Sequence, residues 1–445
     1  MVAPHPTLLR KLRNTSNIVA VNKAVFVPEL HSRYPQDYTS LDVHKVITEN
    51  LPWREWPSPL RLEPFELLES LQPAPMLVDK ILVLCIDFKD KPATLPTSTI
   101  YNRLFGTYSN SLKNYYKEIS HSRYVPNGQL YGWYRAPQNS TYYTDKQNGF
   151  GKYPKSVEKL IEDVVNIASK DHSINWPSFD INNNGYIDNL IVVHSGAEAA
   201  YTGNLDDFWA HIYIIPQPKV IQGKTVWIYA ITSEYINKPT DPQAIGGDVH
   251  EHGHQLGLPD LYDTTYKTNG VGAYSLMGAG SWANKGITPI HLDAWSKYVL
   301  GFADAKENPT GTSHLNDAES HPDIIKYTTA DPKEYYLVEN RQKILYDKYL
   351  PSQGIFVWHI NENKADNTDP TCYLVGLVQA DGLKDLENAR NEGDLSDPFP
   401  GTSNNRSYGV HTTPNSVLCN KTVKSMSISK ISDSGRTMTF YSSPR

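Results

Sequence analysis

The segment from His250 to Asp260, which reads H-E-H-G-H-Q-L-G-L-P-D, constrains the fold more than any other part of the chain. Residues i and i+4 share one face of an α-helix, so His250 and His254 can offer two imidazoles to one metal ion. Gly257 allows the helix to end in a reversal, and Pro259 disfavours its continuation. The segment therefore predicts a helix over 245–257 and a turn that returns Asp260 toward the same ion.

Two imidazoles and a carboxylate, with one position left open, are typical of a catalytic zinc site. Glu251 follows the first imidazole and is expected to act as general base on the water at the open position. His252 falls on a different helical face, so we expect it to be solvent-facing or hydrogen-bonded rather than a ligand. The pattern predicts a zinc-dependent hydrolase.

A second motif, Tyr274 to Trp282, surrounds the single methionine Met277 with small residues. Such a stretch suits a tight turn that passes an apolar sulfur beneath a metal site, and it looks like the Met-turn of metzincins. Without the preceding histidines, a core methionine beside a glycine turn would be the better interpretation.

These motifs resemble the immune inhibitor A-type metallopeptidases, which are secreted zinc endopeptidases of metzincin type. The resemblance implies His250 and His254 as ligands, Glu251 as base and Met277 in the Met-turn. It implies Asp260 as third ligand less firmly, with Asp263 as competitor. The stretches that carry it, besides His250–Asp263, are Lys80–Phe88, Asn114–Ser120, Tyr274–Trp282, Glu334–Gln342 and Asp397–Gly401.

The family also implies protein or peptide substrates and an extracellular location, although no signal peptide is visible. A location outside the cell would permit a disulfide, and Cys372 and Cys419 could pair. Cys85 lies in the apolar run from Ile81 to Ile86 and is expected to be buried as a small hydrophobe.

The predicted fold class is α+β: a zincin- or metzincin-like catalytic domain with a mixed sheet and an active-site helix over 77–310, and a β-rich region over 311–445. Residues 1–76 form an N-terminal extension, either a pro-segment or a permanently packed extension. No cysteine precedes Cys85, so inhibition by this extension would need the α-amine, His5 or steric cover.

A third motif, Asp180 to Asp188, matches the first nine positions of a calcium-binding loop. The expected ligands are the side chains of Asp180, Asn182, Asn184 and Asp188 and the carbonyl of Tyr186. The twelfth position is Ile191 instead of glutamate, and a strand follows instead of a helix. The alternative is an Asn/Gly turn.

Composition excludes other classes. A net charge of −6 and a pI near 6.2 argue against nucleic-acid partners, and no apolar run is long enough to span a bilayer. Neither a G-x-S-x-G elbow nor a phosphate-binding P-loop is present. The sequence predicts a zinc endopeptidase. The alternatives are a non-catalytic, metal-stabilised binding or adhesion protein, against which Glu251 argues, and a zinc hydrolase of non-peptide substrates.

Overall fold

The computed structural model describes residues 79–107, 110–241, 243–420 and 426–443, together with Ala3 and His5. The chain divides into two compact units, Met1–Tyr116 with Tyr124–Leu258, and Lys117–Arg123 with Pro259–Arg445. The division therefore falls inside the segment from His250 to Asp260, whereas the sequence texture predicted a change near residue 310. Apart from Ala3 and His5, the predicted extension over 1–76 lies outside the described residues.

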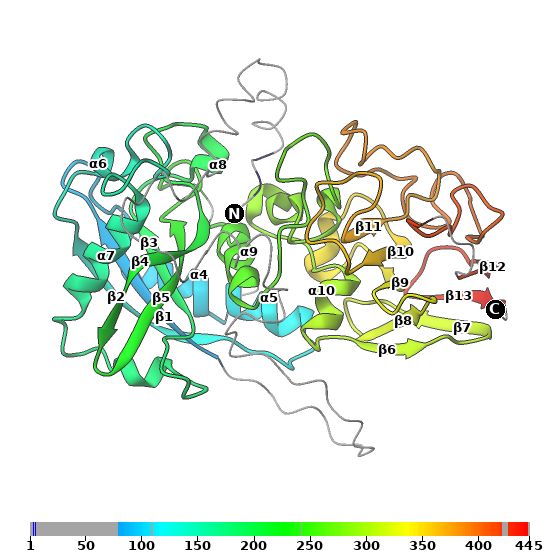
Figure 1. Ribbon diagram of the computed structural model, residues 1–445, viewed down its shortest axis with the longest axis horizontal. Helices are drawn as coiled ribbons and strands as arrows, with labels where there is room; N and C mark the ends of the chain where they lie inside the picture. The colour runs from blue at the N-terminus through cyan, green and yellow to red at the C-terminus, as the bar shows by residue number, and fades with distance from the viewer. Residues whose placement is uncertain are drawn as a thin grey trace. The chain divides into compact units, whose positions relative to one another are not determined.

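The first unit is built on a mixed sheet of five strands in the order β2-β1-β3-β5-β4 (Figure 1). Strands β2, β1, β3 and β5 run parallel, and β4 is antiparallel to β5. Near-continuous apolar stretches form β1 and β3, as expected for parallel strands buried on both faces. The bounds are β1 Lys80–Asp87, β2 Asn127–Arg135, β3 Leu190–His194, β4 His211–Ile221 and β5 Lys224–Ser233.

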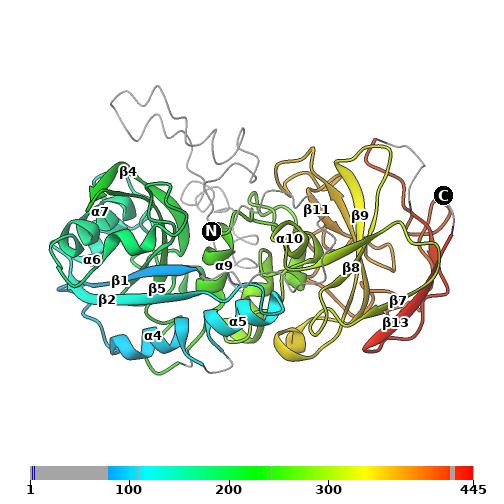
Figure 2. The ribbon, with the colours of Figure 1, turned by 90° about the horizontal axis from the view of Figure 1, so that it is seen from below.

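Helices cover both faces of this sheet, with α7 on one side and α4 on the other (Figure 2). Because successive strand residues point to opposite faces, Leu82, Leu84 and Ile86 of β1 join the core beneath α7. Helix α9 packs against β5 and β4. The helices are α4 Thr97–Phe105, α5 Leu112–Ile119, α6 Ser140–Thr144, α7 Val157–Ala168, α8 Ala199–Thr202, α9 Gly246–Gln255 and the 3₁₀ segment η3 Trp176–Phe179.

The second unit contains two sheets, in the orders β11-β10-β9-β8-β6 and β12-β13-β7. Their shared core includes Val338 and Val357 from the first sheet and Phe440 from the second. Helix α10 packs against β9 and β10. The strands are β6 Asp304–Glu307, β7 Gly311–Asn316, β8 Asp323–Tyr327, β9 Glu334–Arg341, β10 Gly354–Asn361, β11 Val375–Leu377, β12 Ile428–Ser429 and β13 Thr437–Ser442. The helical segments are η4 Gly272–Tyr274, η5 Ala279–Gly286, α10 Ala294–Val299 and η6 Leu345–Tyr349.

The cysteines behave as the sequence suggested. Cys372 and Cys419 form a disulfide in the second unit. Cys85 is a free, buried thiol in β1, and burial raises its pKa to about 12. Such a thiol is inert at neutral pH and acts as a small core hydrophobe.

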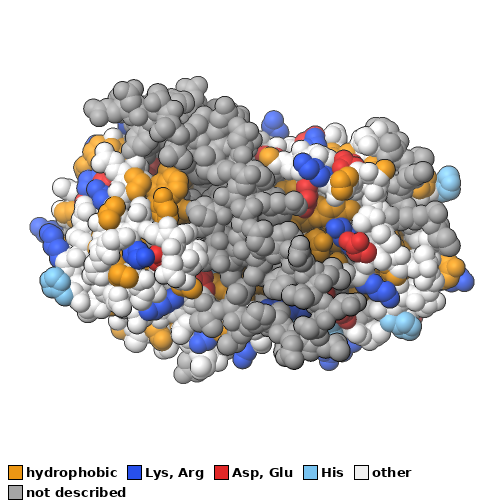
Figure 3. All heavy atoms as spheres, turned by 60° about the horizontal axis from the view of Figure 1, so that its bottom comes forward, with side chains coloured by type: hydrophobic (Ala, Val, Ile, Leu, Met, Phe, Trp, Pro, Cys, Tyr) orange, Lys and Arg blue, Asp and Glu red, His pale blue; other side chains and the backbone are white. Residues whose placement is uncertain are grey.

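On the face shown in Figure 3, basic and acidic side chains of the described residues are interspersed with uncharged ones. Among the described residues, no helix is both long and apolar enough to cross a bilayer.

Candidate metal centre

Helix α9 ends at Gln255, two residues before the predicted end at 257, and the chain reverses at the predicted glycine. Gly257 adopts a positive φ of 96°, which favours glycine, directly after the last helical turn. The amide of Leu258 donates to the carbonyl of Gly253 at 3.1 Å, and the amide of Gly257 donates to that of His254 at 2.9 Å. These two bonds define a Schellman motif, which satisfies the last carbonyls of the helix and reverses the chain.

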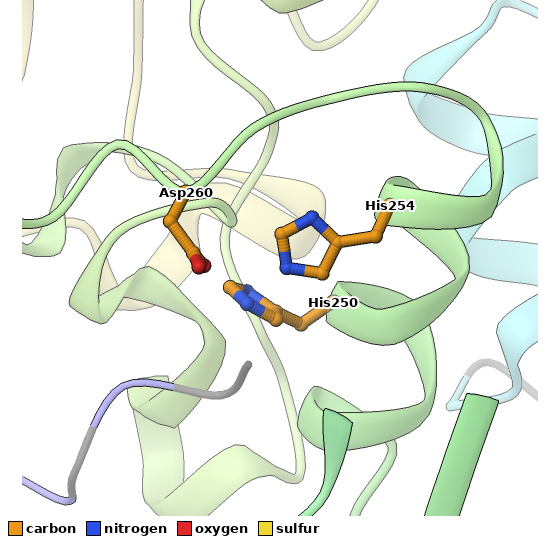
Figure 4. Close-up of side chains that lie close together, drawn as sticks. All are labelled: His250, His254 and Asp260. Carbon is orange, nitrogen blue, oxygen red and sulfur yellow. The ribbon is translucent and has the colours of Figure 1, made fainter. Parts of the chain in front are cut away.

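The reversal brings His250, His254 and Asp260 together, with one potential ligand atom of each within 4.8 Å of the others. The two imidazoles extend from the helix and the carboxylate reaches them from the turn that follows (Figure 4). The group is formed by one short continuous segment of the chain. A donor set of two nitrogens and one carboxylate oxygen fits Zn²⁺.

The orientation of His254 is set by a hydrogen bond behind the ring. Its Nδ1 lies 2.7 Å from the carbonyl oxygen of Leu258, in the turn that ends the helix. A proton on Nδ1 leaves Nε2 as the lone-pair donor, which is the usual arrangement of a metal-binding imidazole. The same turn therefore orients one candidate ligand and returns the chain toward Asp260.

Leu261, the residue after Asp260, is held through both its backbone amide and its backbone carbonyl. The amide of Leu261 donates to the carbonyl of Met277 at 2.8 Å. The carbonyl of Leu261 accepts from the amide of Val271 at 3.0 Å and from Nδ2 of Asn367 at 2.8 Å. Gly270 approaches so closely that a Cβ there would lie 2.2 Å from the Leu261 oxygen.

The predicted Met-turn is buried and tied to its surroundings by polar bonds. Ser275 Oγ donates to Asp293 Oδ2 at 2.7 Å and accepts from the amide of Met277 at 3.3 Å. The carbonyl of Tyr274 accepts from Arg341, whose side chain is fully buried. Because the Met277 carbonyl binds the Leu261 amide, this turn directly supports the residue after Asp260.

Asp263, the alternative third ligand, is engaged within its own loop. Its Oδ1 accepts from the amide and hydroxyl of Thr265 at 2.7 and 2.6 Å. Its Oδ2 accepts from the amide and hydroxyl of Thr268 at 2.9 and 3.0 Å. The side chain of Asp263 therefore caps a turn.

Glu251 is fully buried on α9, immediately after His250. A second carboxyl group, that of Glu198 at the start of α8, lies near enough for the charge of Glu251 to affect it. Burial raises the pKa of Glu198 to about 8, and its Oε1 accepts from the amides of Ala200 and Ala210. Sequence analysis missed Glu198. The available signal was its position shortly after the buried strand β3.

His252 corrects one expectation, because it is buried and not solvent-facing. Its Nε2 lies 2.6 Å from the hydroxyl of Tyr124, which donates to Asp79 Oδ2 at 2.7 Å. Its Nδ1 lies 3.0 Å from Gln255 Oε1. The other expectation, a hydrogen-bonded histidine outside the ligand group, is confirmed. Tyr124 and Asp79 carried no recognisable signal because they are distant from the helix in sequence.

The loop from Asp180 to Asp188 contains the predicted oxygen-bearing side chains, but they bind groups of the protein. Asp180 accepts from the amides of Asn184 and Gly185, each at 3.0 Å. Its Oδ2 also lies 2.5 Å from the ammonium of Lys224. The side-chain oxygens of Asn182 and Asn184 accept from backbone amides at 3.0 and 2.9 Å, the latter from Tyr186.

Asp188 completes the loop by accepting from the amide of Ile181 at 2.6 Å. Burial raises the pKa of Asp188 to about 6. Lys224 supplies a positive charge to the loop, as a calcium ion would. These contacts favour the Asn/Gly turn, and calcium stays a prediction.

Two further candidates for metal binding, His5 and a group of three side chains, contact other parts of the protein. The amide of His5 donates to the carbonyl of Ala200 at 2.8 Å, and its ring contacts that of Tyr201. A second potential ligand group joins Glu334, His359 and Cys419. The sulfur of Cys419 is bonded to Cys372, so it is not available as a thiolate.

Comparison with known proteins gives a consistent assignment. The pre-pro-metalloprotease PrtV of Vibrio cholerae serotype O1 is 30% identical over 342 residues, which are 64% of this chain and 36% of PrtV. Immune inhibitor A of Bacillus thuringiensis subsp. alesti is 30% identical over 269 residues, 49% of this chain and 39% of that protein. The chain therefore spans less than two-fifths of the length of these relatives.

Among solved structures, OgpA from Akkermansia muciniphila aligns over 61% of this chain and 74% of its own. Its TM-score of 0.27 and identity of 14% are too low to indicate a shared fold.

The family comparison covers the segment that carries the candidate centre. Residues 94–303 match the catalytic domain of the immune inhibitor A peptidase M6 family. That range includes α9, Asp260 and Met277. The match confirms the resemblance drawn from the motifs, and this segment belongs to the immune inhibitor A peptidase M6 family.

Proposed function

We propose that the protein is a zinc-dependent endopeptidase whose metal is held by His250, His254 and Asp260. The observation that carries the proposal is the convergence of these three side chains beside Glu251, in a segment that belongs to a peptidase family. The proposed substrates are proteins or peptides, in keeping with the metalloprotease named among the relatives.

Zinc bound to this group would polarise the scissile carbonyl and lower the pKa of a bound water to about 7. In the proposed mechanism, Glu251 accepts the proton of the attacking water and passes it to the leaving amine. His250 and His254 would hold the metal through their imidazole nitrogens, and Asp260 would add a negative oxygen. The burial of Glu251 and His250 keeps bulk water away from the proton being transferred.

The hydrogen bonds of Asp263 and the position of Asp260 support Asp260 as third ligand. Asp263 directs both carboxylate oxygens into Thr265 and Thr268. Recruiting it to a metal would break those bonds, whereas Asp260 already lies beside the imidazoles. Met277 is proposed to form the floor of the centre, since its carbonyl binds the amide that follows Asp260.

We further propose that the protein acts outside the cytosol. The support is the disulfide between Cys372 and Cys419, because disulfides persist mainly in oxidising compartments. A reduced Cys372–Cys419 pair in protein isolated from its native source would contradict this location.

The function is tested with purified protein and casein as substrate. Hydrolysis should stop with 1,10-phenanthroline, continue with the non-chelating 1,7 isomer, and return when Zn²⁺ is added back. Metal analysis should find one zinc per chain. Hydrolysis that survives complete removal of zinc would overturn the proposal, as would zinc-loaded protein that cleaves neither casein nor gelatin, which the binding-protein alternative predicts.

A further inference from the structure

We infer that Asn367 is a positioning residue for the third metal ligand, Asp260. The inference rests on the proposed metal site and adds a residue that the metal-binding motif does not contain. Asn367 lies 106 residues after Leu261, which directly follows Asp260. Both residues belong to the second compact unit.

Asn367 is completely buried and uses its side-chain amide as a clamp. Its Nδ2 donates to the carbonyl of Leu261 and to that of Val375, both at 2.8 Å. Its Oδ1 accepts from the amide of Val375 at 3.1 Å. Val375 begins β11, which pairs with β10, so one side chain ties the peptide after Asp260 to a sheet.

Asp260 needs such a tie because residues 258–261 belong to no helix or strand. His250 and His254 receive their spacing from the backbone bonds of α9, whereas Asp260 follows the end of that helix. On one side of Leu261, the amide binds the Met-turn through Met277. On the other side, the carbonyl binds Asn367 and Val271.

Loss of the Asn367 amide would remove a donor from a buried carbonyl, which costs free energy and loosens the peptide. Residues that orient a metal ligand from behind typically change metal affinity or activity by about 10–100-fold when they are lost. The expected defect is therefore a weaker metal site in a protein that still folds.

Asn340 provides a matched control in the same unit. It is equally buried, and its Nδ2 donates to the carbonyls of Leu315 and Gly435, each at 3.0 Å. Its Oδ1 accepts from Gln342 at 2.7 Å. Leu315 lies in β7, Gly435 precedes β13 and Gln342 follows β9. Asn340→Leu should therefore lower the free energy of unfolding, as Asn367→Leu should. It should not loosen the peptide at Leu261.

The experiment compares Asn367→Leu, Asn340→Leu and Asp260→Ala in the full chain. Zinc dissociation constants are measured by competition with a chromogenic chelator, and the Co²⁺-substituted proteins are compared by visible d–d absorption. Asn367→Leu should weaken zinc binding by about 10–100-fold and change the cobalt spectrum. Asn340→Leu should keep the affinity and spectrum of the wild type at a lower melting temperature.

The outcomes separate this inference from the proposed function. If Asp260→Ala weakens zinc binding but Asn367→Leu matches the wild type, Asn367 has no positioning role and the zinc site stands. Equal losses in Asn367→Leu and Asn340→Leu would also overturn the inference. If Asp260→Ala binds zinc as tightly as the wild type, the assigned third ligand is wrong and the inference falls with it.

A near-isosteric variant covers the case in which Asn367→Leu does not fold. Asn367→Asp keeps the acceptor for the Val375 amide and loses the donor to the Leu261 carbonyl. Wild-type zinc affinity and an unchanged cobalt spectrum in Asn367→Asp would overturn the inference.

Discussion

Helix α9 and the turn-rich segment over 259–278 contribute to the same candidate centre in different ways. The spacing of His250 and His254 follows from helical backbone bonds, and the helix ends in a motif made by neighbouring residues. The Asp260 segment is instead held by Met277, Val271 and Asn367. The candidate pair on the helix is thus determined locally, whereas the candidate ligand in the turn depends on distant side chains.

Both units bury ion pairs near these two segments. In the first unit Arg103 pairs with Asp248 of α9 at 2.9 Å, and aliphatic and aromatic residues form the core on the α7 face. The second unit buries complete ion pairs, Arg341 with Asp347 and Lys297 with Glu339. Arg341 also binds the carbonyl of Tyr274, so buried charge directly supports the predicted Met-turn.

The largest expected effect concerns the helix side. Glu251→Ala should keep the fold and the zinc but lose at least ~10²–10⁴-fold in the rate of peptide hydrolysis, since general acid–base catalysis typically contributes that much. His254→Ala should instead lose the zinc as well. Activity and bound zinc are measured on the same samples. Near wild-type hydrolysis by zinc-loaded Glu251→Ala would contradict the mechanism.

The next effect concerns the buried charge of the second unit. Arg341→Met should lower the free energy of unfolding by about 3–5 kcal/mol, because it leaves the carboxylate of Asp347 buried without its partner. In the exposed ion pair with Asp385, the side chain of Arg390 is 61% exposed. Arg390→Met should therefore change the free energy of unfolding by less than about 1 kcal/mol. Denaturant titration gives both values, and equal effects would contradict the contrast between the two pairs.

The third effect is a pH dependence that belongs to the first unit. His194 is buried at the end of β3, and burial lowers its pKa from 6.5 to about 4. Between these values the unfolded state binds the proton and the folded state does not, so stability falls as pH falls from about 6.5 to about 4. The loss amounts to at most about 3 kcal/mol.

His194→Gln should flatten this slope. Melting temperatures of wild type and variant, measured from pH 7 to pH 4 in excess zinc, isolate the contribution of His194, since every other group is the same in both proteins. Parallel curves over this range would contradict the assignment.

The smallest effect concerns the predicted calcium-binding loop. Its oxygen ligands would come from Asp180, Asn182, Asn184, Tyr186 and Asp188. The ammonium of Lys224 already binds Asp180, so calcium should raise the melting temperature of Lys224→Met more than that of the wild type. The comparison uses calcium against a calcium-selective chelator. No calcium-dependent shift in either protein would show that the loop is a turn and not a cation site.

The sequence by itself was sufficient for the parts that depend on near neighbours. The spacing of His250 and His254 and the glycine at 257 predicted a helix, its end and its reversal, and the structure has all three. The apolar run from Ile81 to Ile86 lies in β1, because a strand buried on both faces must be apolar on both. The motifs also identified the family, which the comparisons confirm.

Only the tertiary structure decided what distant residues do. The burial of His252, the proximity of Glu198 to Glu251, the Lys224 ammonium at the predicted calcium loop and the clamp made by Asn367 all involve partners far apart in sequence. No periodicity marks such partners, because a buried polar side chain is chosen for the single group it satisfies. Backbone repetition makes helices and strands readable from sequence, whereas these bonds exist only once the chain has folded.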